Sequence, residues 1–242
     1  LMGHSGEGFI SGIAVFNYNV GAIFVIIFVS LFFLPFYIKS GIYTIPEYLG
    51  RRFDNRSRKY FSFITIIGNV FLDAGAALYT GALILKIIFP EIDMMWIIIG
   101  MALMAGTYTI IGGLSSAINA DMIQSIILIA GSVLLSIFCF NSVGGWENFV
   151  EHFHDGVWLN LIRPNSDTTV PWFSIFLSIP ILGFYFWGNN QVIVQRVMSA
   201  KTVNEGRLGF LFVAFLYVFT LFIFIAPGMV GRMIDLFGVG DT

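Results

Sequence analysis

The side chains that could do chemistry in this sequence are a few polar residues inside long apolar stretches. Asn189, Asn190 and Gln191 follow one another in one such stretch, and Asp73 and Asp121 lie in two others. Amides and carboxylates are costly in hydrocarbon, so they face a bundle interior or a watery cavity. We therefore interpret the three amides as the lining of an inner vestibule, or alternatively as the mark of a membrane exit.

The two acids allow different interpretations. Asp121 lies near the start of its apolar stretch, where it or Asn119 could simply cap a helix, or where Asp121 could be a way-station for a cation. Asp73 lies near the middle of its stretch, with no opposite charge at helical spacing. It could accept hydrogen bonds from Asn69 or Thr80, or it could be protonated. Both acids are candidates for an ion pathway.

A third polar group lies in the first apolar stretch, at Asn17, Tyr18 and Asn19. Asn19 and Ala22 share a helix face with Tyr18. Because an asparagine in hydrocarbon needs a partner, this face should point inward. Tyr217 interrupts another apolar run at a similar depth.

The sequence gives little support for a metal site or a disulfide bond. Cys139 is the single cysteine of the chain, and His152 and His154 form a pair with no third ligand nearby. His4 gives no signal by itself. A membrane-embedded enzyme would need clustered acid, base or metal groups, so we predict that the protein is not an enzyme and has no cofactor.

The amino-acid composition indicates whether these stretches lie in water or in lipid. Hydrophobic residues make up 57% of the chain, charged residues only 11%, and the mean hydropathy is +0.88. A soluble domain carries about 25% charged residues, so this chain is predicted to be an integral membrane protein with the lipid bilayer around it. The net charge of −2 argues against a nucleic-acid partner.

Six stretches are long enough to cross a bilayer as helices, near 9–38, 60–89, 94–112, 119–141, 172–195 and 207–234. Strands of a barrel would be shorter and would alternate. The sequence therefore predicts an all-α membrane protein. We expect residues 1–242 to form a single transmembrane domain, and the chain to be a fragment of a longer protein.

The loops predict an orientation. Six Lys and Arg residues lie within 39–59 and three within 196–207, so nine of the twelve fall on one side. Positive loops stay cytoplasmic. We predict a plasma (inner) membrane protein with residues 1–8, 90–93, 142–171 and the C-terminus outside.

Two cytoplasmic loops contain capping-box sequences, at Thr44–Glu47 and at Thr202–Glu205, and each predicts the start of a helix. In the outer loop, "GGWENFVEHFHD" places apolar residues on one helical face. This segment is predicted to lie along the bundle surface.

Three motifs together strongly resemble the sodium/solute symporter family, and within it the sodium/glucose cotransporter branch. They are "GIYTIPEYLGRRF" (41–53), "GGLSSAINADMIQS" (112–125) and "FYFWGNNQVIVQRVMSAK" (184–201). The resemblance covers almost the whole chain. It implies a leucine-transporter-like inverted-repeat helical bundle, with Leu1–Gly8 as the outer end of the first core helix and the six stretches as core helices two to seven.

The resemblance also carries the family's sugar-binding positions onto this chain. The family's Tyr-Glu pair on core helix two is Tyr18-Asn19 here. Its Asn on core helix six is Gly183 here, four residues before the tryptophan of the "WG" pair, Trp187. The aromatic inner gate is Phe186.

The resemblance also bears on Tyr217, Asp121 and Asp73. The Lys that a bacterial galactose-type member has on core helix seven is Tyr217 here. Asp121 matches the family's acid on the sodium exit path, whereas Asp73 matches no family role. The gate and stacking positions are kept, and the hydrogen-bonding positions are not.

The resemblance implies sodium-coupled symport of a small polar solute by alternating access, with sodium as the coupling ion. A sugar or polyol fits the branch, while the changed positions leave an amino acid, carboxylate or amine open. A channel or sensor of the same fold is also open. The family's main sodium ligands come from segments outside this sequence.

Overall fold

A computed structural model describes residues 2–153 and 156–237 of the chain, and these residues form helices and no strand. The helices divide into two compact units. The first unit combines Leu1–Tyr43 with Ile126–Thr242, and the second is Thr44–Ser125. Each unit is described by itself below.

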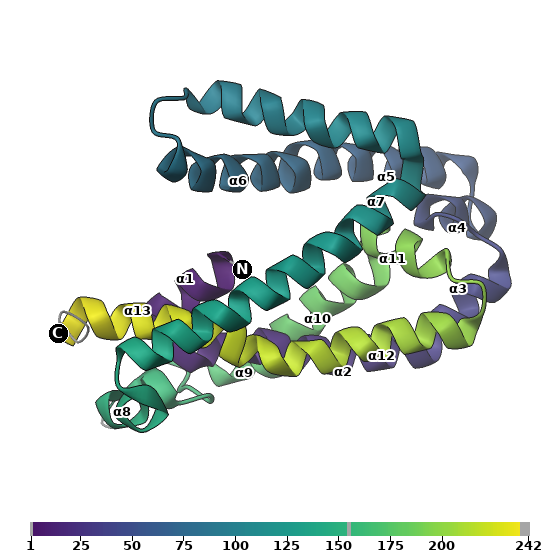
Figure 1. The fold of residues 1–242 in the computed structure, drawn as a ribbon. Helices are drawn as coiled ribbons and strands as arrows, with labels where there is room; N and C mark the ends of the chain where they lie inside the picture. Colours follow the sequence, from purple (N-terminus) through teal and green to yellow (C-terminus); the bar gives the residue numbers. More distant parts are fainter. Residues whose placement is uncertain (1, 154–155, 238–242) are drawn as a thin grey trace. The chain divides into compact units, whose positions relative to one another are not determined.

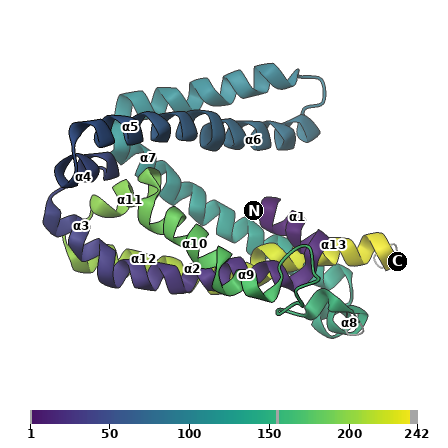
Figure 2. The same cartoon turned by 180° about the vertical axis from the view of Figure 1, so that it is seen from behind.

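The first unit begins with two helices joined by a sharp turn. Helix α1 (Met2–Ser11) ends at a short 3-10 segment, η1 (Gly12–Val15), and α2 (Phe16–Phe28) follows. Gly12 has φ +68°, a conformation that side chains with a Cβ rarely adopt. The turn separates the partners of the two helices, because α1 packs on α13 while α2 packs on α12 and α10 (Figures 1 and 2).

The rest of the first unit supplies those partners. Its elements are η2 (Val29–Phe33), α3 (Leu34–Ser40), α8 (Gly145–Phe153), η4 (Val157–Leu159), α9 (Trp172–Phe176), α10 (Ser178–Phe184), η5 (Tyr185–Asn189), α11 (Gln191–Met198), α12 (Val203–Thr220), η6 (Leu221–Ile225) and α13 (Ala226–Phe237). The predicted cap of α12 is confirmed, because the Thr202 side chain accepts a hydrogen bond from the Glu205 N–H at 3.2 Å. The predicted outer-loop helix is α8, and its Phe149 and Phe153 are buried.

The second unit contains α4 (Ile45–Arg52), α5 (Asn55–Ile67), η3 (Gly68–Ala74), α6 (Gly75–Ile88) and the first part of α7 (Met94–Ser142). The predicted start of α4 is confirmed, because the Thr44 hydroxyl caps the helix by accepting from the Glu47 N–H at 3.2 Å. A Cβ at Gly81 would overlap the Met101 side chain, so this glycine allows α6 and α7 to approach closely.

Five helical stretches of the described chain are long and apolar enough to cross a membrane: Met2–Ser40, Asn55–Ile88, Met94–Ser142, Trp172–Asn189 and Val203–Leu236. The prediction of six differs at α7, which contains two of the predicted stretches. The expected loop between them is a single non-helical residue, Gly113, with φ +59°. One glycine is enough to bend the chain, so no loop is needed.

Four of the segments named above, η2, η3, η5 and η6, are π-helical. π-Turns are rare and occur frequently at functional sites. Residues from the predicted sites lie in two of them, Asp73 in η3 and Phe186, Trp187 and Asn189 in η5.

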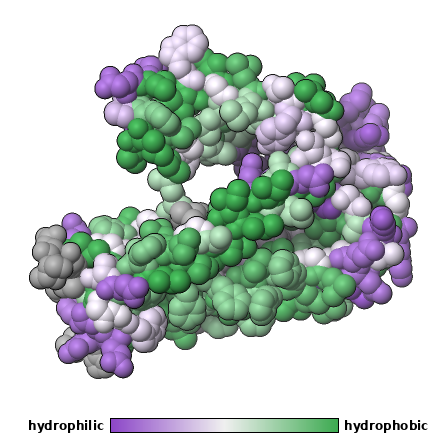
Figure 3. Space-filling model, in the orientation of Figure 1, coloured by the Kyte–Doolittle hydropathy of each residue, from purple (hydrophilic) through white to green (hydrophobic). Residues whose placement is uncertain are grey.

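The first unit has two buried apolar clusters. One joins the η1 turn to α8 and α13 and includes Val15, Phe149 and Met233. The other lies between α2, α12 and η5 and includes Ala22, Val25, Trp187 and Phe210. On the face that Figure 3 shows, apolar side chains cover most of the length of each unit and hydrophilic residues gather towards the ends, as expected for elements surrounded by lipid.

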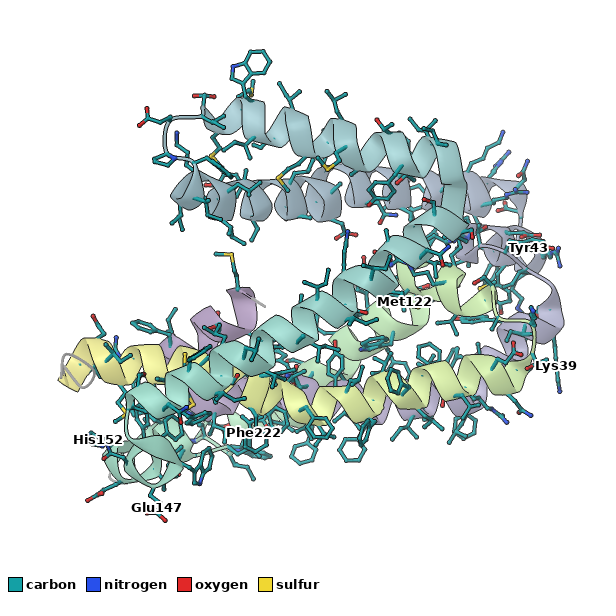
Figure 4. All side chains as sticks on the ribbon, in the orientation of Figure 1. Lys39, Tyr43, Met122, Glu147, His152 and Phe222 are labelled. Atoms are coloured by element: carbon teal, nitrogen blue, oxygen red, sulfur yellow. The ribbon has the colours of Figure 1, made fainter. Side chains whose placement is uncertain are left out.

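The charges of the loops predict which side of the membrane each loop faces. In the first unit, residues from loops predicted on opposite sides lie at opposite ends. Lys39 and Tyr43 lie at one end, and Glu147 and His152 lie at the other (Figure 4). Residues 2–8 form most of α1, which agrees with the expectation that this segment is part of a helix.

Candidate functional site

The run of three amides marks a break in a helix. Asn190 has an extended backbone (φ −67°, ψ 118°), and its side chain accepts a hydrogen bond from the Val192 N–H at 3.0 Å. Asn190 therefore caps α11. The predicted stretch 172–195 is wrong in its extent, since its first helical part ends at Asn189. Asparagine is among the preferred N-cap residues, a local signal that our sequence analysis missed.

The backbone groups freed by this break find partners. The Asn190 N–H donates to the Tyr185 carbonyl at 2.9 Å, which closes the π-turn. The Tyr37 hydroxyl donates to the Gly188 carbonyl at 3.0 Å, from the neighbouring α3. The break is thus built into the packing of the unit and leaves Asn189 exposed beside it.

An aromatic layer lies next to the break. Trp187 is 8% exposed, and its ring meets Tyr217 edge-on at 5.6 Å and Phe210 at 6.3 Å between centroids. Ala22 belongs to the same buried cluster. The ring centroids of Phe186 and Trp187 lie 5.4 Å apart. Phe186 is nevertheless 45% exposed, so it presents a free ring face.

Gly183 lies where α10 crosses α2. A Cβ at this position would be 2.9 Å from Cγ2 of Val25, closer than real Cβ contacts come. The structure therefore gives Gly183 a packing function between two helices.

A chain of hydrogen bonds connects α1, α2 and α12. Asn19 is 2% exposed; its Nδ2 donates to Thr220 Oγ1 at 2.7 Å, and Thr220 Oγ1 donates to the Tyr217 carbonyl at 2.5 Å. His4 Nε2 lies 3.0 Å from Asn19 Oδ1. Because Nδ2 must be the donor to Thr220, Oδ1 accepts, and His4 Nε2 carries the proton.

The prediction that this polar face points inward is confirmed for Asn19 and Ala22, which are buried, but not for Tyr18, which is 41% exposed. His4 was missed because it meets Asn19 only after the chain turns at Gly12. The residues next to His4 in the sequence do not predict that contact.

A second set of contacts fastens the outer loop to this turn. Asn17 Nδ2 donates to the Leu161 carbonyl at 2.6 Å. The Arg163 guanidinium donates to the Ser11 carbonyl and, at 3.0 Å, to Asp167 Oδ2. The hydrogen bond from Arg163, followed by one from the Thr169 N–H, lowers the pKa of Asp167 from 3.8 to about 2.

A cavity of about 490 Å³ lies between α1 and this loop. Tyr18 is 41% exposed and belongs to its wall. The wall is formed by Gly3, His4, Glu7, Val15, Tyr18, Thr168, Thr169 and Val170.

The two candidate acids of the ion pathway lie in the second unit. Asp121 is eight positions beyond the break at Gly113, inside the helical part of α7, so the interpretation of Asp121 or Asn119 as a helix cap is wrong. Asp73 is exposed within η3.

Metal-binding groups are scarce in the described part of the chain. Residues 2–153 and 156–237 contain no group of three or more His, Cys, Asp or Glu that could hold a metal ion. His152 Nδ1 lies 2.8 Å from the Asn148 carbonyl, and its predicted companion His154 lies outside the described residues.

Three relatives resemble the chain over 97% of its length. It is 30% identical over 256 residues to sodium/glucose cotransporter 1 of Oryctolagus cuniculus and 32% identical over 243 residues to the sodium/glucose cotransporter of Vibrio parahaemolyticus. It is 30% identical over 251 residues to sodium/myo-inositol cotransporter 2 of Bos taurus. The chain spans only 38%, 45% and 37% of these proteins.

The fold has a solved counterpart in the substrate-bound, outward-open state of a Na+-coupled sialic acid symporter. The TM-score is 0.83 at 22% identity, covering 96% of this chain and 48% of that one. This confirms the predicted all-α bundle. The model of the sodium:solute symporter family matches residues 1–239. The chain therefore belongs to the sodium:solute symporter family.

Proposed function

We propose that the full-length protein carries out sodium-coupled symport of a small polar organic solute by alternating access. The chain supplies part of the core as a single transmembrane domain, corresponding to core helices two to seven and the outer end of helix one. Membership of a family of sodium-coupled transporters supports this function and disfavours an enzyme. Sodium is the coupling ion.

One observation carries the proposal. Residues from three separate elements, Asn19 and Ala22 on α2, Trp187 on η5 and Tyr217 on α12, converge within the first unit. A buried polar chain adjoins an aromatic layer there, with Tyr18 in the cavity wall beside it. This combination suits a solute that has both hydroxyl groups and an apolar ring face.

A sugar or polyol is the solute class that we propose. Two relatives are named for glucose and one for myo-inositol, while the structural counterpart is named for sialic acid. The exposed Phe186 offers a ring surface for stacking, and the buried Trp187 packs against it. The alternative is an amino acid, carboxylate or amine carried by the same fold.

The remaining site residues receive roles in the same scheme. We place Phe186 at the inner side of the solute site, with Gly183 at the helix crossing behind it, and Asn189, Asn190 and Gln191 along the watery route inward. Asp121 and Asp73 belong to the ion pathway. The loops at 39–59 and 196–207 face the cytoplasm and 142–171 faces outward, in the plasma (inner) membrane.

Uptake into liposomes by the full-length protein tests the proposal. An inward sodium gradient should drive saturable accumulation of a radiolabelled sugar or polyol, and collapse of the gradient should abolish it. A channel of the same fold would instead pass current without saturating solute dependence. Absence of sodium-driven accumulation of every sugar, polyol, amino acid, carboxylate and amine tried would refute symport.

A further inference from the structure

A corner between two helices of the second unit carries a dense cluster of positive charge. Helix α4 ends at Arg52, and α5 begins three residues later at Asn55 (Figures 1 and 2). We call five exposed basic side chains around this turn the corner cluster: Arg51, Arg52, Arg56, Arg58 and Lys59. Residues 44–60 contain two acids against these five bases, so the segment has a net charge of +3.

The packing of the corner fixes the helix ends that carry these side chains. A Cβ at Gly50 would be 3.0 Å from Cδ of Arg58, so the aliphatic stem of Arg58 lies against the bare backbone of α4 while the side chain stays exposed. The Asp54 carboxylate accepts a hydrogen bond from the Ser57 N–H at 2.7 Å and caps α5. The corner cluster is thus presented on two anchored helix ends, which lowers the entropic cost of binding a ligand.

The acids of the segment leave most of the positive charge uncompensated. Glu47 is engaged by Arg51, with 2.6 Å between Oε1 and Nη2. Asp54 is engaged by the helix cap. In the described part of the chain, the other four members of the corner cluster form no ion pair. The surface of the corner therefore attracts anions.

Two of these charges lie where the helix itself disfavours them. Arg56 and Arg58 are in the first turn of α5, at the end where the peptide dipoles add up to a partial positive charge. Asp54 offsets part of this charge from the cap, but the first turn itself contains no acid. An anion bound at the corner would relieve the repulsion among the side chains and between them and the helix end. The cluster is therefore better suited to holding a negative ligand than to stabilising α5.

The aromatic neighbours of the cluster indicate where that ligand comes from. Helix α5 opens the apolar stretch Asn55–Ile88, which is long enough to cross a membrane, so the corner lies where this stretch leaves the bilayer. Phe53 and Tyr60 flank the basic residues, and each is 70% exposed. Exposed aromatic rings beside basic residues are typical of segments at the boundary between headgroups and acyl chains. A soluble anion would make no use of these rings, whereas a lipid would.

We propose that the corner cluster binds the phosphate headgroup of an anionic phospholipid. Guanidinium groups donate paired, charge-assisted hydrogen bonds to phosphate oxygens. Phe53 and Tyr60 would lie among the upper parts of the acyl chains, and the net positive charge of the corner would select an anionic over a zwitterionic headgroup. The inference goes beyond the proposed symport and does not depend on the identity of the solute.

Two phospholipids that share dioleoyl chains and differ in the headgroup test this inference: phosphatidylglycerol, which is anionic, and phosphatidylcholine, which is zwitterionic. The melting temperature of the purified full-length protein in neutral detergent, followed against lipid concentration, gives an apparent dissociation constant for each. We expect phosphatidylglycerol to bind more tightly. Raising the ionic strength to about 1 M, where the Debye length is about 3 Å, should reduce this preference. Inorganic phosphate should not stabilise the protein as phosphatidylglycerol does.

A triple variant, Arg52→Gln with Arg56→Gln and Lys59→Gln, removes three charges of the cluster. Arg58 is kept because its stem packs on Gly50. Each basic residue near an anionic lipid surface strengthens binding about fivefold. Loss of three should therefore weaken phosphatidylglycerol relative to phosphatidylcholine by about tenfold to 100-fold.

Two control variants separate charge and position from other effects. Arg52→Lys with Arg56→Lys and Lys59→Arg keeps the charge at the same positions and should retain most of the preference. Lys39→Gln with Lys201→Gln removes exposed basic residues of the first unit and should leave the preference nearly unchanged.

Several results would overturn the inference. Equal affinity of the wild type for the two lipids would refute it without any variant, even if the triple variant failed to fold. Equal stabilisation by inorganic phosphate would show a site for a soluble anion. A loss below about tenfold in the triple Gln variant, or an equal loss in either control, would show that the charge of this corner does not select the lipid. None of these measurements uses sodium-driven uptake, so failure here leaves the proposed symport standing.

Discussion

Replacing Arg163 with alanine should lower the free energy of unfolding by about 3 kcal/mol. The side chain is 7% exposed and that of its partner Asp167 is 16% exposed, so the pair is mostly shielded from water. The substitution leaves a carboxylate without its cation and the Ser11 carbonyl without its donor. Breaking a fully buried pair costs about 3–5 kcal/mol, and the partial exposure of Asp167 brings the expected cost to the lower end.

A double-mutant cycle with Arg163→Ala and Asp167→Ala separates the pair from other effects of truncation. Denaturant titration of the full-length protein in detergent gives the four free energies of unfolding. A hydrogen bond to a charged group contributes about 1.5–3 kcal/mol, and we expect a coupling energy of about 1.5 kcal/mol. Arg163→Lys keeps the charge but loses the planar fork that reaches two acceptors, so it should recover only part of the loss.

The coupling between Arg163 and Asp167 would be refuted if the effects of the two single substitutions on the free energy of unfolding were additive. A coupling energy below about 0.5 kcal/mol is within the range of independent sites. It would mean that Arg163 and Asp167 do not hold the loop to α1 as a unit. Full recovery of stability by Arg163→Lys would show that charge alone, without the two-sided geometry, is sufficient.

Four further predictions follow from the same structure. The Arg163 hydrogen bond holds the pKa of Asp167 at about 2 against an ordinary 3.8, so this stabilising contribution is complete above pH 3.8 and is lost as the pH falls towards 2; Asp167→Asn should flatten that part of a melting-temperature profile. Asn190→Ala removes the cap of α11 and should cost about 1 kcal/mol in denaturant titration, while Asn190→Ser should retain most of it. Asp121→Asn should change the sodium concentration for half-maximal uptake more than solute affinity, and an unchanged sodium titration would remove Asp121 from the ion path. Phe186→Ala should weaken solute binding or uncouple it from sodium, whereas Asn189→Leu should slow transport at nearly constant affinity; the reverse pair of results would exchange gate and vestibule.

Features determined by neighbouring residues could be predicted from the sequence. The helix caps at Thr44 and Thr202 are confirmed because a cap needs only a side chain and an N–H three positions later. The apolar stretches were also found, because burial in lipid acts on every residue of a span. The helix cap at Asn190 was not predicted although its signal was local, because the three amides were interpreted as a vestibule lining or a membrane exit.

Contacts between distant segments could not be predicted in this way. The hydrogen bond from Asn19 to Thr220 joins positions 201 residues apart, and Arg163 reaches Ser11 across 152 residues. Both depend on where the turn at Gly12 sends the chain. The inward direction of Asn19 could be inferred from the cost of burial, but the identity of its partners could not.

The π-helical segments have a mechanical consequence. Each contains one residue more than an α-helix needs to cover the same rise, and an α-helix advances about 100° and 1.5 Å per residue. If the surplus residue in η5 moved along its helix, the stretch that it passed would rotate by about that angle without unwinding. One of the two neighbours Phe186 and Trp187 would then point where the other had pointed, so a ring could be turned into or out of contact while the backbone stays hydrogen-bonded.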